Sequence, residues 1–262
     1  MTGSKATGAS SRSDATCLEA TAGGEEIVDR VASVLHPYQE GRKTERAGIT
    51  LSYAQSIDGS IAANIGARTA ISGDQSNIVT HRLRAMHAAI LVGVGTVLVD
   101  DPQLTVRHVS GEHPRPVIID SQLRTPVHAQ LLQRRDASPL IVATQQASLK
   151  REQRLREAGA SVLRIGAEDA ELVDLKLLFE RFRRLGIATV MVEGGASIIA
   201  SILRAELADQ LLVTIAPRFL GGLHAVSGFG DIDPRRRPRL THTCFTHLQD
   251  DLVVYGRLVR GR

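Results

Sequence analysis

The stretch Thr189-Val190-Met191-Val192-Glu193-Gly194-Gly195-Ala196-Ser197 decides the fold. Its first four residues are apolar or β-branched, which predicts a short buried strand. Two glycines then turn the chain, and the residues up to about Arg204 predict a helix. The free N–H groups at the start of such a helix, together with its dipole, favour a phosphate group. Gly194 and Gly195 carry no side chain that would block the approach of a ligand.

The carboxylate of Glu193 should repel a phosphate, so we expect it to face a second ligand. It can accept hydrogen bonds from hydroxyl groups or from the exocyclic amines of a heterocycle. The alternative is a plain tight turn in which Glu193 is solvated.

The same strand-then-helix unit recurs along the chain and predicts an α/β fold. Short apolar runs that alternate with helical segments are typical of a largely parallel sheet covered by helices. We predict strands at about 49–54, 89–92, 117–119, 140–143, 162–165, 189–192 and 211–215. We predict helices at about 74–87, 147–158, 171–185 and 196–204, the first of them capped by Ser72 or Asp74. Residues 244–248 and 252–258 predict a C-terminal antiparallel hairpin that makes the sheet mixed.

The N-terminal part is predicted to differ from the rest of the chain. Residues 1 to about 24 are rich in Ser, Thr, Ala and Gly and are typical of a disordered tail. Residues 25–35 have helical periodicity, and Pro37 is expected to stop that helix. The helix could pack on the domain, on a partner subunit or on nothing. We therefore divide the chain into an N-terminal extension, 1–46, and a catalytic domain, 47–262.

Composition limits the function classes. With 43% hydrophobic and 23% charged residues the chain can form a core, whereas 3% aromatic residues disfavour a single-strand nucleic-acid binder. The net charge of +4 mildly favours phosphates, and the run Arg235-Arg236-Arg237 is read as a solvated loop or a phosphate contact. Cys17 and Cys244 have no disulfide or zinc spacing, and the histidines form no metal motif. We expect a cytoplasmic protein with no metal, no membrane segment and no nucleic-acid partner.

Two further segments carry polar groups at strand ends. Residues 52–59 join a buried-type strand to a turn, where Ser56 and Asp58 can bind a ligand or merely form an Asx-type turn. Residues 93–107 follow another short strand, and Thr96 there can cap a helix and offer its hydroxyl to a cofactor. Arg107 is far enough along to form the opposite lip of a pocket. The Gly93-Val94-Gly95 pattern is weak evidence alone because the third glycine of the dinucleotide fingerprint is missing.

Taken in order, these segments resemble the reductase domain of riboflavin biosynthesis, whose fold is similar to dihydrofolate reductase. The resemblance covers about 50–222 and, more loosely, the hairpin. Its motifs are Ala54-Gln55-Ser56-Ile57-Asp58-Gly59, Leu83-Arg84-Ala85, Gly95-Thr96-Val97 through Asp100-Asp101-Pro102-Gln103-Leu104-Thr105-Val106-Arg107, Ile119-Asp120-Ser121, Val192-Glu193-Gly194-Gly195, and Ile215-Ala216-Pro217 with Leu220-Gly221-Gly222. The resemblance implies a mixed, mostly parallel sheet flanked by helices, and a homodimer.

The resemblance also implies an activity: NADPH-dependent reduction of the ribosyl chain of a ribosylamino-pyrimidine 5′-phosphate to the ribitylamino form. It places cofactor contacts at Ala54, Thr96, Asp100, Ser121, Gly194, Gly195, Ala196 and Ser197. It places substrate contacts at Ser56, Arg84, Leu104, Arg107 and Glu193. Arg84 and Arg107 suit a phosphate because guanidinium groups form forked, charge-assisted hydrogen bonds. Asp58 and Glu193 are the catalytic candidates for the general acid, and water is the alternative proton source.

The chain departs from the family pattern in two ways. Its first ~50 residues carry no zinc-deaminase motif, so we expect no deamination by this chain. Arg68 and Ala70 stand where the family often has Ser and Trp, and Arg68 could contact the 2′-phosphate of NADPH or face solvent. Whether the ring is the amino or the oxo form stays open. The alternatives are a reductase of a pterin, dihydrofolate or another heterocycle, and a non-catalytic nucleotide-binding protein.

Overall fold

A computed structural model describes residues 22–43, 45–259 and 261 of the chain. Its strands are β1 (Gly48–Ser56), β2 (Ser60–Ala62), β3 (Ala89–Gly93), β4 (Arg115–Ile119), β5 (Leu140–Ala143), β6 (Ser161–Arg164), β7 (Thr189–Val192), β8 (Gln210–Ala216), β9 (Leu223–His224), β10 (Arg239–Leu248) and β11 (Asp251–Val259). Its α-helices are α1 (Ala22–Gln39), α2 (Asp74–Met86), α3 (Val94–Asp100), α4 (Leu149–Glu157), α5 (Leu175–Arg184) and α6 (Ala196–Arg204). Two short 3-10 helices cover Gln130–Gln133 and Pro234–Arg236.

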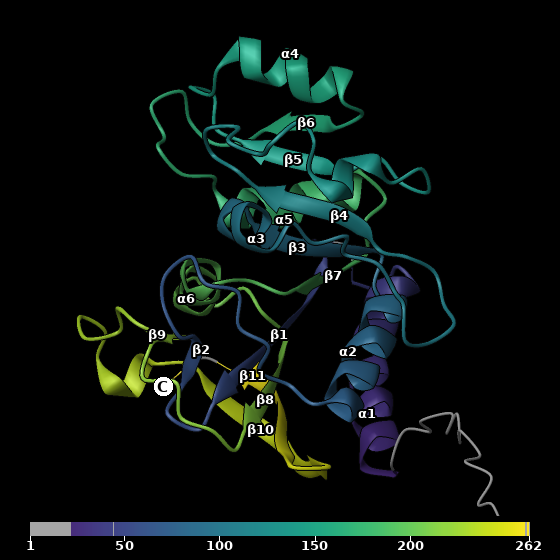
Figure 1. Cartoon of the computed structure of the whole chain (residues 1–262), viewed down its shortest axis with the longest axis vertical. Helices are drawn as coiled ribbons and strands as arrows, with labels where there is room; N and C mark the ends of the chain where they lie inside the picture. Colours follow the sequence, from purple (N-terminus) through teal and green to yellow (C-terminus); the bar gives the residue numbers. More distant parts are fainter. Residues whose placement is uncertain (1–21, 44, 260, 262) are drawn as a thin grey trace, which may run out of the picture.

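One nine-stranded sheet in the order β10-β11-β8-β1-β7-β3-β4-β5-β6 runs through the protein (Figure 1). The neighbouring pairs from β8 to β6 are parallel, whereas β11 pairs antiparallel with both β8 and β10. The predicted α/β class, with a mixed, mostly parallel sheet and a C-terminal hairpin, is confirmed. The short strands β2 and β9, which pair beside the main sheet, were not predicted as a pair.

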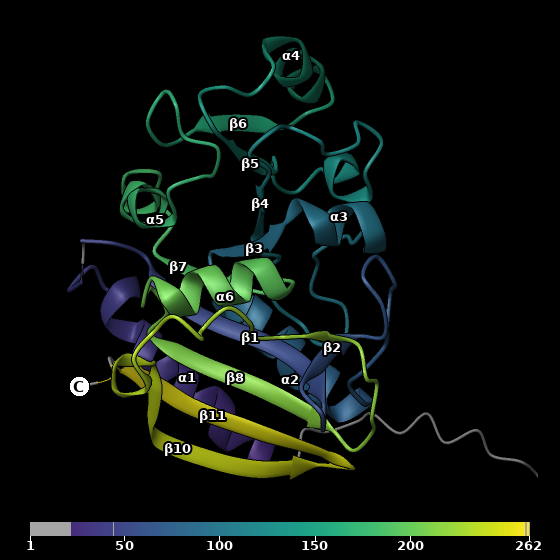
Figure 2. The ribbon, with the colours of Figure 1, turned by 90° about the vertical axis from the view of Figure 1, so that its left-hand side faces the viewer.

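Helices cover both faces of the sheet because successive side chains of each buried strand point to opposite sides. In β7, Val190 and Val192 join the core under α5 and α6, while Met191 joins the core under α1 and α2. Farther along the second face, α3 and α4 pack on Ile90 and neighbouring residues. Figure 2 shows this layering, with α5 and α3 on opposite sides of the sheet.

Helix α1 is longer than predicted and packs on the sheet, which answers the question that its sequence left open. Ile27, Val31 and Leu35 are fully buried in the core shared with α2, β8 and β11. The expectation that Pro37 stops the helix is wrong, since α1 continues to Gln39. Pro37 lies in the last turn, where its missing N–H removes little of the helix ladder. The predicted disordered tail falls almost wholly on residues 1–21, outside the described ranges.

The end of α1 is anchored to the residue that precedes β8. The Tyr38 hydroxyl donates a 2.6 Å hydrogen bond to Asp209, and Arg46 donates two bonds of 2.9 Å to the same carboxylate. Asp209 also accepts the backbone N–H of Ile49 at 2.8 Å. This carboxylate therefore ties α1, the start of β1 and the start of β8 together.

The start of α2 is also held by a distant carboxylate. We expected Ser72 or Asp74 to cap this helix, but the N-cap residue is Gly73, which makes no side-chain cap. Instead Asp251, at the hairpin turn, accepts the Gly73 N–H at 2.8 Å and the Ser76 hydroxyl at 2.7 Å. The local expectation was wrong because a tertiary partner replaced the local cap.

A chain of buried hydrogen bonds crosses the sheet under α1 and α2. His87 donates from Nδ1 to the Leu83 carbonyl at 2.6 Å, so its neutral ring accepts from the Thr50 hydroxyl at Nε2, 2.7 Å away. Gln210 donates to Thr50 at 2.9 Å and accepts from the Tyr255 hydroxyl at 2.9 Å. Burial lowers the pKa of His87 to about 4, although the Leu83 carbonyl and the Glu193 charge oppose the shift.

This lowered pKa predicts an acid-sensitive fold. Between about pH 6.5 and pH 4 the unfolded chain binds a proton at His87 that the folded chain does not bind. The free energy of unfolding should therefore fall as the pH drops through this window, by about 1.4 kcal/mol per pH unit for this residue. Urea unfolding of His87→Gln at several pH values should show a slope that is shallower by about this amount. Equal slopes for both proteins would mean that His87 is protonated in the folded state.

Candidate active site

The predicted site residues gather beyond the carboxyl ends of the central strands. Glu193 and the Gly194-Gly195 turn follow β7, Thr96 lies in α3 after β3, and Ser121 follows β4. In open α/β sheets, ligands bind in crevices at these strand ends. Ala54 and Ser56 belong to β1, which extends farther in this direction than β7, because Leu51 pairs with the last residue of β7.

An ion pair between Arg84 and Glu193 occupies the centre of this edge. Arg84 donates from Nε and Nη2 to the two carboxylate oxygens of Glu193, both at 2.6 Å. Its third nitrogen, Nη1, donates to the Thr105 carbonyl at 3.0 Å. The two side chains are only 13% and 18% exposed, so loss of either partner leaves a poorly solvated charge. Burial disfavours the charged guanidinium, but Glu193 more than compensates and raises the pKa of Arg84.

The two glycines after β7 differ in what surrounds them. A Cβ on Gly194 would lie 2.7 Å from the Cβ of Ile198, one helical turn further on, so packing within the protein requires this glycine. A Cβ on Gly195 would lie 3.9 Å from the Thr96 hydroxyl and meet nothing closer. Gly195 therefore borders open space next to α3.

Helices α6 and α3 start close together and without side-chain caps. Gly195 and Gly93 are their N-cap residues, and neither helix start donates a backbone N–H to a capping side chain. Gly93 packs on Ile198 of α6, whose Cγ1 would lie 3.0 Å from a Cβ added at Gly93. A Cβ added at Gly95 would meet no other part of the protein within 4 Å. Thr96 lies inside α3, so the expectation that it caps this helix is wrong. The unpaired N–H groups and the open space at Gly95 and Gly195 fit a phosphate-bearing cofactor.

Asp58 is surrounded by donors at the end of β1. Its carboxylate accepts hydrogen bonds from the hydroxyls of Ser56 and Ser60 at 2.6 and 2.8 Å, and from the N–H groups of Leu220 and Gly221 at 3.0 and 2.9 Å. These donors, Ser56 first, hold the pKa of Asp58 well below its usual range. Because a general acid must carry a proton, this environment favours a structural role for Asp58, closing the β1–β2 turn against the loop after β8. Ser56, a predicted substrate contact, is fully buried within the same cluster.

The remaining predicted contacts surround the ion pair less closely. Leu104 is buried in the core under α3 and has a left-handed backbone, φ 55°. Arg107 is exposed, with a 3.2 Å hydrogen bond to the Thr105 hydroxyl. Burial raises the pKa of Asp100, and the positive charge of Arg68 opposes this rise.

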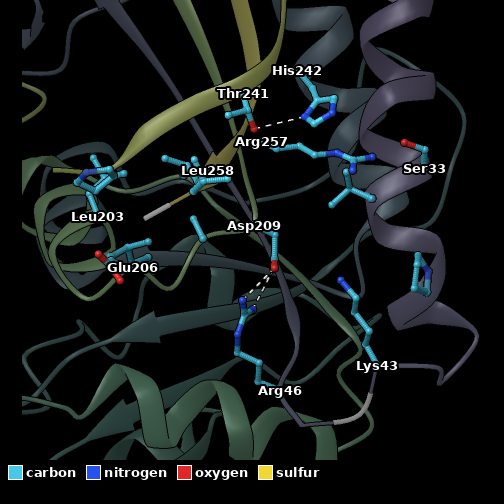
Figure 3. A pocket seen from close by; sticks show the side chains of 16 residues that line it. Ser33, Lys43, Arg46, Leu203, Glu206, Asp209, Thr241, His242, Arg257 and Leu258 are labelled. Atoms are coloured by element: carbon cyan, nitrogen blue, oxygen red, sulfur yellow. Dashed lines mark hydrogen bonds and ion pairs between the residues drawn. The ribbon is translucent and has the colours of Figure 1, made fainter. Parts of the chain in front are cut away.

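A separate cavity of about 690 Å³ lies at the other, amino end of the strands. Arg46, Lys43, Asp209 and Arg257 line it, together with residues of α1, α6 and the hairpin (Figure 3). None of the predicted site residues lines this cavity. Two acidic residues, Glu206 and Asp209, also line it, and Asp209 is paired with Arg46.

Residues 22–43, 45–259 and 261 contain no cluster of His, Cys, Asp and Glu suited to a metal ion. Within the same residues, no helix is long and apolar enough to cross a bilayer.

Comparison with known proteins identifies the family. The model of the RibD C-terminal domain matches residues 47–254. The chain belongs to this family. The resemblance inferred from the sequence motifs is thereby confirmed.

Relatives of this family cover most of the chain. The 2,5-diamino-6-ribosylamino-4(3H)-pyrimidinone 5′-phosphate reductase of Eremothecium gossypii is 32% identical over 87% of this chain and 96% of its own length. The riboflavin biosynthesis protein RibD of Aquifex aeolicus is 35% identical over 80% of this chain, which spans 58% of that protein's length. The structure of the riboflavin biosynthesis reductase Rib7 of Saccharomyces cerevisiae is 30% identical, with a TM-score of 0.65 over 87% of this chain and 99% of that one.

The different surroundings of Gly194 and Gly195 generate a testable contrast. Gly195→Ala adds a methyl group to the open space, so it should cost less than about 1 kcal/mol of stability yet weaken NADPH binding at least tenfold. Gly194→Ala collides with Ile198 and should lower the free energy of unfolding by about 1–3 kcal/mol. Urea unfolding and fluorescence titration with NADPH measure the two effects. If Gly195→Ala binds NADPH as tightly as the wild type, the cofactor does not use this turn.

Proposed function

We propose that this chain reduces the ribosyl group of a ribosylamino-pyrimidine 5′-phosphate to the ribityl chain, with NADPH as the reductant. The observation that carries the proposal is the Arg84–Glu193 pair. The pair fixes the carboxylate of Glu193, which we propose to contact the substrate, directly before the open, uncapped turn at Gly195. The turn at residues 193–195 thus offers a carboxylate to the pyrimidine substrate and backbone N–H groups to the phosphates of NADPH.

We further propose that the ring is the 2,5-diamino form. The Eremothecium gossypii relative, which this chain matches over most of both lengths, is named for that compound. The exocyclic amines of such a ring are donors, and the carboxylate of Glu193 is an acceptor of suitable chemistry. The predicted homodimer stays a prediction.

NADPH would be held by the starts of α6 and α3, with Gly195, Ser197 and Thr96 nearest to it. When bound, it supplies the hydride, so the protein needs to align the two reactants and exclude water. Ala54, Asp100, Ser121, Gly194 and Ala196 are the further residues that we propose to border it.

The substrate would lie on the other side of the ion pair. Arg107 is exposed and makes no ion pair within the described residues, so its guanidinium is available to a phosphate. Arg84 holds Glu193 in place and turns its remaining nitrogen toward Thr105. Since Asp58 is kept ionised, we propose that water supplies the proton that completes the reduction.

The test of the proposed function is NADPH consumption by the purified protein with the diamino and the oxo forms of the substrate. We expect turnover with the diamino form, and the ribityl product should appear in equal amount to oxidised cofactor. Dihydrofolate is the comparison substrate. Absence of turnover with both pyrimidines by a folded protein that binds NADPH, or faster turnover of dihydrofolate, would contradict the proposal.

The position of Glu193 between the two ligands predicts how its loss divides between them. Glu193→Gln keeps the shape but removes the charge that pairs with Arg84, so kcat/KM for the pyrimidine should fall by about a hundredfold. The dissociation constant of NADPH should change less than about threefold. Steady-state kinetics and cofactor titration measure both quantities, and a larger loss in NADPH affinity than in turnover would mean that Glu193 faces the cofactor.

Arg84→Gln is the matched variant on the other side of the pair. Because each single change already breaks the ion pair, the double variant should lose less than the sum of the two single losses. Additive losses would show that the two side chains act independently.

A further inference from the structure

His81 occupies a position that its sequence did not single out. It lies one turn before Arg84 in α2, and it is only 4% exposed. Its Nδ1 accepts a 2.9 Å hydrogen bond from the backbone N–H of Arg107. A buried side chain of α2 thereby holds the backbone of a residue that we propose to contact the substrate phosphate.

The opposite edge of the His81 ring faces Arg84. Nε2 of His81 lies 3.4 Å from Nη1 of Arg84, the nitrogen that donates to the Thr105 carbonyl. The ring also meets His108 edge-to-face, with centroids 4.6 Å apart and an interplanar angle of 90°. His81 is therefore packed between Arg84 of α2 and the loop formed by residues 105–108, and it contacts both.

The ring can perform this role only while it is neutral. A neutral imidazole has a single acceptor nitrogen, and the 2.9 Å bond from Arg107 identifies it as Nδ1. Burial, followed by the charges of Arg84, His108 and Arg107, lowers the pKa of His81 to about 3. The ring therefore stays an acceptor throughout the neutral range and adds no third positive charge beside the two guanidinium groups.

We propose that His81 is a positioning residue: its Nδ1 fixes the 105–107 backbone against Arg84, so that the guanidinium of Arg107 faces the phosphate of the substrate. The inference rests on the proposed function and assigns to His81 the selection of the phosphorylated over the dephosphorylated substrate. The hydrogen bond is the operative contact, since an apolar side chain of similar size would fill the space but accept nothing.

The test compares two substitutions of His81. His81→Leu removes the acceptor, whereas His81→Asn places Oδ1 near the position of Nδ1. We expect His81→Leu to lower kcat/KM for the phosphorylated pyrimidine at least tenfold, and to change kcat/KM for the dephosphorylated ribosylamino-pyrimidine less than threefold. His81→Asn should restore most of this discrimination, and KM for NADPH should be unaffected in both variants.

His87→Leu is the control for a purely structural effect. His87 is buried at the end of the same helix, but its bonds go to Leu83 and Thr50. Its substitution should lower the thermal midpoint and leave the phosphate discrimination unchanged. An unchanged discrimination in His81→Leu, or an equal loss in His87→Leu, would overturn the inference.

Hydrogen exchange of the Arg107 amide separates this inference from the proposed function. The exchange should be faster in His81→Leu than in the wild type and in His81→Asn, whatever the substrate is. Unchanged exchange contradicts the positioning role. A wild type that turns over neither pyrimidine contradicts the proposed function instead, because the amide measurement needs no substrate.

Discussion

The ion pair between Arg84 and Glu193 is the interaction on which the candidate site depends. It joins α2 to the end of β7, and through the Thr105 carbonyl it also holds the loop that leads to Arg107. Both charges are largely removed from water, so each needs the other to stay ionised at low cost. The pair is also directional, because a forked guanidinium matches a carboxylate in one plane. The orientation of Glu193, and with it the boundary between the two proposed ligands, is therefore set by a helix from a different part of the chain.

Local patterns in the sequence were sufficient for the elements of the fold and insufficient for their connections. The strands at 89–92, 140–143 and 189–192 were predicted within one residue, since short apolar runs between helices leave few alternatives. The Asp251 contact at the start of α2 was not predictable, because its partners are far apart in the sequence. The bulge between Thr241 and Cys244 likewise let β10 begin five residues before the predicted strand.

The same division holds for the site. The glycines and charged residues at strand ends were identified as candidates because their chemistry is visible in single residues. Their pairings were not: Arg84 and Glu193 were assigned separate ligand contacts, although they bind each other. The sequence predicted Asp58 as a catalytic acid, but it could not show the N–H donors from the loop after β8 that help to keep this carboxylate ionised. The role of His81 was not predictable, because the sequence of a helix does not show which distant backbone N–H its histidine accepts.

The side chain of Ile198 packs against both glycine turns, the one at Gly93 and the one at Gly194. It fills the space that a Cβ on Gly194 would enter and lies against Gly93, while Gly195 faces the open side. The evolutionary constraints on these glycines should therefore differ in kind. Gly93 and Gly194 depend on an internal neighbour, so related chains with a smaller residue at 198 could tolerate alanine at Gly93. Gly195 has no such partner, and its substitution pattern should follow the ligand, so the family can change its chemistry there without repacking the core.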